Sequence, residues 1–339
     1  MHFTSLLGSI DLHIGEFQPP VVAAVAYLVL YLRRTRTLAR EGRPVARWRI
    51  CSFVAGVLLM LIVQVGPLDT LADEVLFAHM VQHLVIGDFA SLFIVLGLTG
   101  PVLAPLLRIR ATRPLRVLAH PLVALTLWAI DLYAWHLPVL YQLAIQHDLV
   151  HAFEHACFLW AGTLLWLGLI GPLPKPVWFG GWGRLGYVIG VRFIGGVLGN
   201  VLLWTQQVIY PVYKATDAAR GLNPLSDQNI AGAVMMIEEI ILTILLLGWL
   251  FYRLAVQDDE RQGLLDLAAA RGFELSEGRA ARAAAAGAGA AEHLRERILA
   301  PPPPPRPDVT GSQVPEHEAG VLTGPAGPAP PTDAPPRAT

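Results

Sequence analysis

Long apolar stretches alternate with short polar segments along the first 256 residues of the chain. The stretches cover residues 18–32, 50–66, 77–107, 117–136, 149–171, 185–210 and 229–253. A helix of roughly 20 apolar residues crosses a bilayer and satisfies its backbone hydrogen bonds within its own segment. The pattern predicts an all-α, polytopic membrane bundle of seven transmembrane helices. The third stretch is too long for one straight span, and we expect its second half to bend at Gly97, Gly100, Pro101 and Pro105.

The composition agrees with a membrane protein. Of the 339 residues, 54% are hydrophobic and 15% are charged, whereas soluble domains contain about 25% charged residues. The net charge of −1 gives no reason to expect a nucleic-acid partner. Cys51 and Cys157 lie in different apolar stretches, so they predict neither a disulfide framework nor a thiolate metal site.

The basic residues predict the orientation of the bundle, because cytoplasmic loops are enriched in Lys and Arg. The first loop contains seven arginines between residues 33 and 49, the third contains four between 108 and 116, and the fifth contains Lys175 and Arg184. The intervening loops carry only Lys214 and Arg220. We therefore expect an extracytoplasmic N-terminus and a cytoplasmic C-terminus.

The chain divides into three predicted parts. Residues 1–256 form the transmembrane domain. Residues 257–300 are rich in Ala, Arg and Glu and predict a cytoplasmic helical segment interrupted by Gly272, Gly278, Gly287 and Gly289. Residues 301–339 contain 13 of the 27 prolines, and such a composition is typical of disorder.

Six of the eleven histidines fall at the predicted extracytoplasmic ends of three helices. His79 and His83 begin the third stretch, His136 ends the fourth, and His151 and His155 begin the fifth; His147 lies in the loop before them. Each HxxxH pair places two imidazoles on one helix face, and neutral imidazole is a common ligand of copper, zinc and iron. A single such histidine is usually an interfacial side chain, and His147 fits that interpretation. Two pairs and a third histidine on one membrane face predict a metal site.

Other polar residues are candidates to complete this site. Glu154 lies between the histidines of the second pair, Met80 and Met235 are soft ligands that would favour Cu(I), and carboxylates or amides near the histidines would orient the rings from a second layer. These second-layer candidates are Gln82, Asp88, Asp131, Glu154 and Asp227. Deeper in the membrane, we expect Arg192 to pair with Glu238 or Glu239, since isolated charges are costly there.

Four motifs together resemble a known family. HMVQH at 79–83, WHLP at 135–138, HAFEH at 151–155 and DQNIAGAVMM at 227–236 are similar to those of the multi-spanning CtaG assembly factors of caa3-type cytochrome c oxidases. The resemblance covers roughly residues 20–253. It implies a non-enzymatic protein of the bacterial plasma membrane that contacts oxidase subunits transiently. The motif positions of the family fall on His79, Met80, His83, His136, His151, Glu154, His155, Asp227, Gln228 and Met235.

The leading hypothesis is that this site binds copper and helps to insert it into the oxidase, with an extracytoplasmic copper chaperone as a further partner. One alternative is a seven-span zinc hydrolase that uses His83, His151, His155 and Asp131, in which zinc would activate a water molecule. Another is a haem carrier with His83 and His155 as axial ligands. A copper site, a zinc site and a haem site all remain open from the sequence alone.

Overall fold

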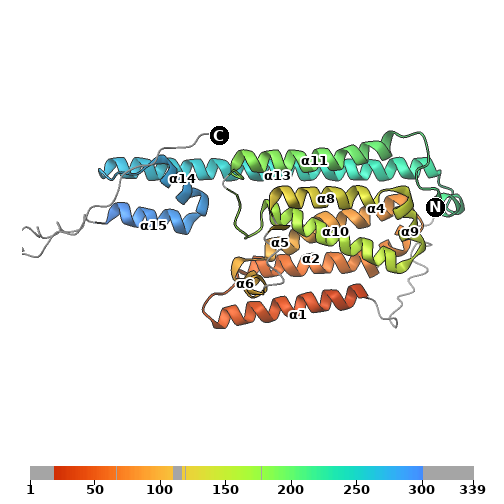
Figure 1. The fold of residues 1–339 in the computed structure, drawn as a ribbon, viewed down its shortest axis with the longest axis horizontal. Helices are drawn as coiled ribbons and strands as arrows, with labels where there is room; N and C mark the ends of the chain where they lie inside the picture. Colours follow the sequence, from red (N-terminus) through yellow and green to blue (C-terminus); the bar gives the residue numbers. More distant parts are fainter. Residues whose placement is uncertain (1–18, 66, 110–116, 119, 177, 301–339) are drawn as a thin grey trace, which may run out of the picture. The chain divides into compact units, whose positions relative to one another are not determined.

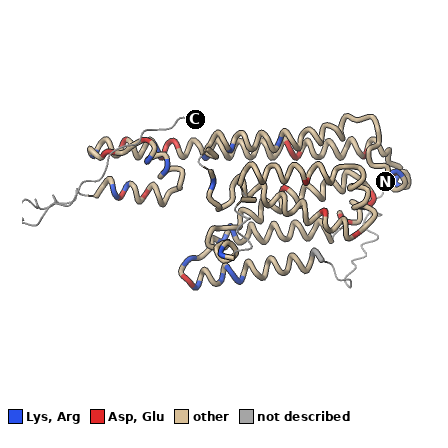
Figure 2. Tube along the Cα trace, in the orientation of Figure 1, with Lys and Arg blue, Asp and Glu red and all other residues tan. Residues whose placement is uncertain are grey.

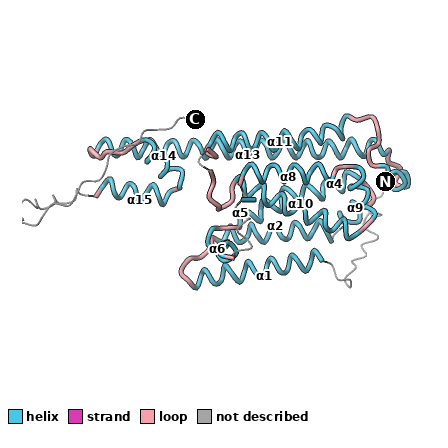
Figure 3. Tube along the Cα trace, viewed as in Figure 1, coloured by secondary structure: helices cyan, strands magenta, loops and turns pink. Residues whose placement is uncertain are grey.

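A computed structural model describes residues 19–65, 67–109, 117–118, 120–176 and 178–300 of the chain. Every regular element within these ranges is helical (Figure 3). The elements, in chain order, are α1 (Pro19–Arg40), α2 (Arg47–Val65), α3 (Pro67–Ala72), α4 (Leu76–Leu84), the π-helix η1 (Val85–Ala90), α5 (Ser91–Gly97), α6 (Gly100–Arg108), α8 (Pro121–Trp135), α9 (Pro138–Gln146), α10 (Asp148–Leu169), α11 (Gly181–Trp204), the 3₁₀-helix η3 (Pro211–Tyr213), α12 (Lys214–Ala219), α13 (Pro224–Ala270), α14 (Glu277–Ala286) and α15 (Ala288–Leu299). The predicted tail at 301–339 lies outside the described residues.

Five of these helices are long and apolar enough to cross a membrane. They are α2, the continuous run from α4 to α5, α10, α11 and α13. A sixth span is obtained if α8 and α9 are counted together, although the two helices are bent by 70°. Of the seven predicted spans, five or six are therefore found by length and composition among the described residues. The first predicted span corresponds to α1, whose charged residues Arg33, Arg34, Arg36 and Arg40 all lie in its second half.

The spanning helices of the first compact unit, residues 1–260, run side by side (Figure 1). The helix α10 lies centrally and packs against α8, α5 and η1, while α2 packs against α1, α5 and η1. Close packing depends on small residues: a Cβ built on Gly162 of α10 would lie only 1.9 Å from the carbonyl oxygen of Gly87 in η1. The glycine therefore lets α10 approach the helix that carries His79 and His83.

The third predicted span contains an irregular middle. Its helix widens into the π-helix η1 just after His83, and two side chains bond its carbonyl groups: Trp166 Nε1 donates to the carbonyl oxygen of Asp88 at 2.9 Å, and the Ser91 hydroxyl donates to that of Gly87. The helix ends at Gly97, and Thr99 caps the next helix, α6, whose second residue is Pro101. The predicted bend is therefore a true break between α5 and α6.

The second compact unit covers residues 261–339, four residues from the predicted boundary after residue 256. Its described part contains the end of α13 and the helices α14 and α15. Leu264, Ala268, Ala280, Leu294 and Ile298 form its small apolar core. Gly272 and Gly287 lie between helices with positive φ angles of 62° and 102°, as expected for helix ends. Gly278 and Gly289 instead lie within α14 and α15.

Candidate metal centre

The first histidine pair lies on α4, near the end of the bundle where α9 also lies (Figure 1). His79 is fully buried and His83 is 5% exposed. The start of α4 is held in place from a distant part of the chain, because the Asp227 carboxylate accepts hydrogen bonds from the backbone N–H groups of Leu76 at 2.7 Å and Phe77 at 3.1 Å. A carboxylate at this position satisfies free N–H groups and favours the helix dipole. Asp227 therefore fixes the helix that presents His79.

The second pair lies on α10, whose N-terminal turns face α4. His151, Glu154 and His155 belong to this helix, and Glu154 is fully buried. One ligand atom from each of His79, His83, His151 and Glu154 can be chosen so that all four lie within 4.8 Å of one another. Two ligand atoms on opposite sides of one ion lie about 4 Å apart, given metal–nitrogen distances of about 2.0–2.1 Å. The four groups therefore lie close enough together to share one ion after small side-chain rotations.

The imidazole rings of these histidines and the Glu154 carboxylate lie close together. Glu154 Oε2 lies 3.9 Å from His79 Nε2 and 3.7 Å from His83 Nε2. The ring centroids of His79 and His151 are 5.1 Å apart, and those of His83 and His155 are 5.4 Å apart. His155 therefore belongs to the same group of side chains. We call His79, His83, His151, Glu154 and His155 the histidine cluster.

The polar atoms of the histidine cluster are buried and unsatisfied. Both ring nitrogens of His79 and of His83, both carboxylate oxygens of Glu154, and Nε2 of His151 and His155 have no hydrogen-bond partner among the described residues. Leaving one buried polar group unpaired costs about 1–3 kcal/mol. So many unpaired donors and acceptors in one place are rare in proteins. A bound cation would satisfy several of them at once.

His136 lies beside the histidine cluster, 6.4 Å from His83 between ring centroids. Its Nδ1 lies 2.7 Å from the carbonyl oxygen of Leu132. Because a carbonyl only accepts, Nδ1 carries the proton, and in the neutral ring Nε2 keeps a free lone pair. That Nε2 is buried and has no partner in the described part of the chain. A backbone bond of this type commonly orients a metal-binding imidazole.

The remaining predicted site residues lie around the cluster. Met80 and Met235 are buried in an apolar group with Tyr141, Leu198 and Leu202. Asp131 is half-buried on α8 and does not belong to the four-residue ligand group. Asp88, predicted to support the rings, lies instead 3.7 Å from Arg192. The exposed His147 occupies the N-cap position of α10, and its side chain makes no capping hydrogen bond.

Gln82 and Gln228 hold the surrounding backbone. Gln82 Nε2 donates to the carbonyl oxygen of Val63 at 2.6 Å and to Asp69 Oδ1 at 2.7 Å, so it ties α4 to α2 and α3 rather than orienting a ring. Gln228 Oε1 accepts from the Ile209 N–H at 2.7 Å, and its Nε2 donates to the carbonyl oxygen of Gln207 at 3.0 Å. Gln82 thus joins three helices, and Gln228 fixes the loop after α11, at the end of the bundle that carries the cluster.

Acidic groups surround the exposed side of the cluster. Asp73 Oδ1 lies 4.0 Å from His151 Nδ1, and the two side chains are 59% and 15% exposed. Burial raises the pKa of Asp73 to about 6, and the nearby carboxylates of Asp69 and Asp148 add to this effect. His151 is thus the cluster member most open to solvent. An ion that approaches it from solvent passes the carboxylate of Asp73. Cations are attracted to such an entrance.

Three buried tyrosines complete the wall beside His79, and sequence reasoning missed two of them, Tyr141 and Tyr213. The Tyr141 ring lies 5.1 Å from that of His79, and its hydroxyl lies 3.0 Å from the Tyr213 hydroxyl. Tyr210 stacks on Tyr141 and donates to the carbonyl oxygen of His136 at 2.7 Å. The residues LYQ at 140–142 contain no spacing signal that would have linked Tyr141 to the histidines.

Comparison with known families decides which family the chain belongs to. The sequence model described as "Cytochrome c oxidase caa3 assembly factor (Caa3_CtaG)" matches residues 29–257. The chain belongs to this family. In this caa3 assembly factor, the matched region includes the whole histidine cluster, together with His136, Asp227 and Gln228, whereas α14 and α15 lie outside it. No curated protein and no solved structure matches the chain.

Proposed function

We propose that this caa3 assembly factor binds copper in the histidine cluster and passes it to a cytochrome c oxidase during assembly. The observation that supports the proposal is the group of buried, unpaired ligand atoms of His79, His83, His151 and Glu154, which lie within 4.8 Å of one another. Imidazole nitrogens suit copper, and a carboxylate neutralises part of its charge in a site of low polarity.

The donor set suits transfer better than storage. Thiolates hold copper most tightly, but Cys51 is exposed and Cys157 is only half-buried, and neither belongs to the ligand group. Imidazoles release the ion more readily, and His151 keeps a partly exposed edge. An ion can therefore enter and leave past His151 without unfolding of the bundle. The role is non-catalytic, with an oxidase subunit as acceptor and an extracytoplasmic copper chaperone as donor.

The distribution of charge supports an extracytoplasmic position of the cluster. Lys and Arg gather at the end of the bundle where α1 ends, α2 begins and α6 lies, whereas acidic residues predominate near α9 (Figure 2). The positive end faces the cytoplasm in most membrane proteins. In the proposed topology, the cluster faces outward in a bacterial plasma membrane. The helix α1 is then a seventh span, with Val22, Val25 and Leu30 on a lipid-facing side and its arginines at the cytoplasmic surface.

Metal analysis of the protein purified in detergent tests the proposal. We expect stoichiometric copper in the wild type and none in the variant His79→Ala/His83→Ala/His151→Ala/His155→Ala. His147→Ala is the matched control, because this histidine is exposed at the start of the same helix α10, and it should retain the metal. A wild type that supports oxidase assembly without binding copper would refute the proposal.

The same preparation also distinguishes bound copper from bound zinc or haem. Bound zinc with turnover of a lipid substrate would indicate a hydrolase, and a Soret absorption band would indicate a haem carrier; either result contradicts the copper proposal. In cells, the four-histidine variant should lower the amount of copper-loaded oxidase in the membrane, while His147→Ala should leave it unchanged.

A further inference from the structure

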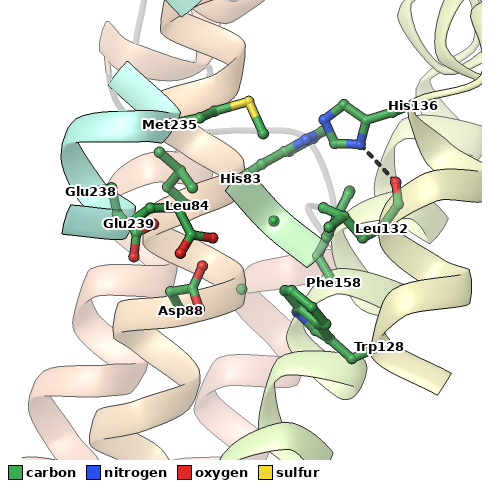
Figure 4. Close-up of a pocket in the computed structure, with 12 residues that line it drawn as sticks. His83, Leu84, Asp88, Trp128, Leu132, His136, Phe158, Met235, Glu238 and Glu239 are labelled. Carbon is green, nitrogen blue, oxygen red and sulfur yellow. Dashed lines mark hydrogen bonds between the residues drawn. The ribbon is translucent and has the colours of Figure 1, made fainter. Parts of the chain in front are cut away.

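A small internal cavity begins at the histidine cluster and extends into the bundle. Its volume is about 40 Å³, which is enough for water. His83, His136 and Met235 lie along one part of its wall, and Asp88, Glu238 and Glu239 lie along another (Figure 4). The cavity therefore connects the histidines with a second polar group at membrane depth.

This second group surrounds Arg192 of α11. Its guanidinium lies 3.0 Å from Glu239, 3.6 Å from Glu238 and 3.7 Å from Asp88. Arg192, Asp88 and Glu238 are 7–8% exposed, and Glu239 is 9% exposed. The predicted pairing of Arg192 with the glutamates is confirmed, and the structure adds Asp88 from η1. We call these four residues the Arg192 cluster.

The charges of the Arg192 cluster do not balance if every member is ionised. Three carboxylates and one guanidinium would leave an excess of two negative charges away from water. Burying an uncompensated charge is so costly that a carboxyl group protonates instead. Glu239 lies closest to Arg192 and is the best paired member. Glu238 and Asp88 lie farther, at 3.6 Å and 3.7 Å. Of these two, Glu238 has both oxygens buried without a hydrogen-bond partner among the described residues, whereas Asp88 has one such oxygen.

We propose that Glu238 holds a proton when the histidine cluster is free of metal and releases it through water in the cavity when a cation binds there. This inference rests on the proposed metal binding. The groups that face Glu238 are Asp88 from η1, Arg192 from α11, Glu239 on its own helix, and His83 and His136 across the cavity. Trp128 of α8 and Phe158 of α10 complete the wall without adding charge.

The exchange is balanced in charge. One positive charge enters the histidine cluster, the O–H bond of the Glu238 carboxyl group breaks, and the proton leaves by way of the water in the cavity. The bundle then holds a cation and a carboxylate in place of a neutral carboxylic acid. No electron is transferred. Because opposite charges attract strongly where the dielectric constant is low, a metal ion near His83 favours the Glu238 carboxylate over its neutral acid form. Release of the proton therefore makes metal binding more favourable.

Infrared spectroscopy of the metal-free protein tests the proton itself, independently of copper. At neutral pH, we expect a carboxylic acid C=O stretching band that is weaker by one carboxyl group in Glu238→Gln. Asp266→Asn is the control, because this exposed acid lies on the same helix α13 but does not line the cavity, and its replacement should leave the band unchanged. An unchanged band in Glu238→Gln overturns the proposal, whether or not the protein binds metal.

Titration calorimetry in buffers of different ionisation enthalpy tests the coupling. The wild type should release one more proton per copper ion than Glu238→Gln. By linkage, its copper affinity should also rise tenfold more per pH unit than that of the variant. Equal proton counts with normal copper binding overturn the coupling but leave the proposed function intact. Absence of copper binding in the wild type refutes the proposed function and, with it, the coupling.

Discussion

The contact between Gly162 and Gly87 makes the sharpest test of how the bundle builds its histidine cluster. In Gly162→Ala, the new Cβ would lie 1.9 Å from the Gly87 carbonyl oxygen and 2.8 Å from Ser91 Oγ. Ordinary contact begins at 3.4 Å, so the two helices must separate by about 3.4 − 1.9 = 1.5 Å at this point. Backbone atoms form the contact, and rotation of a side chain cannot relieve it.

The displacement would reach the ligands because both helices carry them. The helix α10 contains His151, Glu154 and His155, and the run that includes Gly87 contains His79 and His83. Metal sites tolerate deviations of about 0.2 Å in ligand distance. If only a third of the separation reached the cluster, the shift of about 0.5 Å would still exceed that tolerance. Gly162→Ala should therefore weaken copper binding without removing any ligand.

The substitution should also destabilise the bundle. Overpacking of this kind costs about 1–3 kcal/mol, which exceeds the gain of up to about 1 kcal/mol from replacing a helical glycine by alanine. At about 2–4 °C per kcal/mol, the Tm should fall by several degrees. Thermal unfolding in detergent and copper content measure the two effects. Gly196→Ala is the matched control, since a Cβ there meets nothing within 4 Å and should raise the Tm. A Tm for Gly162→Ala equal to that of the control, with full copper content, would refute this reasoning.

Three further predictions concern side chains around the cluster. Asp227→Ala removes the acceptor for the first N–H groups of α4 and should cost about 1–2 kcal/mol in unfolding free energy, and calorimetric copper titration should show a weaker affinity. Gln82→Ala removes the bonds to Val63 and Asp69 and should lower stability by about 1–3 kcal/mol, as measured by thermal unfolding; an unchanged Tm would mean that these bonds contribute nothing. Burial and the neighbouring Asp227 raise the pKa of Asp217 to about 6. The folded state therefore disfavours ionisation of this carboxyl group. As a result, the wild type loses stability as the pH rises from about 4 through 6. Asp217→Asn should therefore have a higher Tm than the wild type above pH 6 and the same Tm below about pH 4; a constant difference across this range would contradict the assignment.

The position of the histidines at one end of the bundle could be predicted, because it depends on local sequence patterns. Each HxxxH pair occupies one helix face by its spacing alone, and each pair begins an apolar stretch. Alternation of the spans then places both pairs at the same end of the bundle, where the structure brings His79, His83, His151 and Glu154 together. The number of spans was harder to predict. The arginines in α1 and the bend at Pro138 make two of the stretches ambiguous by length and composition.

The supporting contacts could not be predicted, because they join residues far apart in the chain. Asp227 was expected near the rings, yet its carboxylate bonds the backbone of α4, 151 and 150 positions away. Asp88 was expected to support the histidines, but it lies beside Arg192. An amphipathic pattern fixes which face of a helix is buried, but it does not say which neighbour a buried carboxylate will meet.

The π-helix η1 has a consequence for how sequence changes in this span would act. An α-helix turns by about 100° for each residue, and a π-helical turn accommodates one residue more than an α-helical turn. Deleting one residue between Val85 and Ala90 would let this turn become α-helical, because the widened turn holds one residue more for the same rotation. The half that carries His79 and His83 would then keep nearly its present orientation relative to α5. Deleting a residue from the α-helical part of the same span would instead rotate its two halves against each other by about 100°. The widened turn is therefore the place in this membrane crossing where the loss of one amino acid disturbs the histidines least.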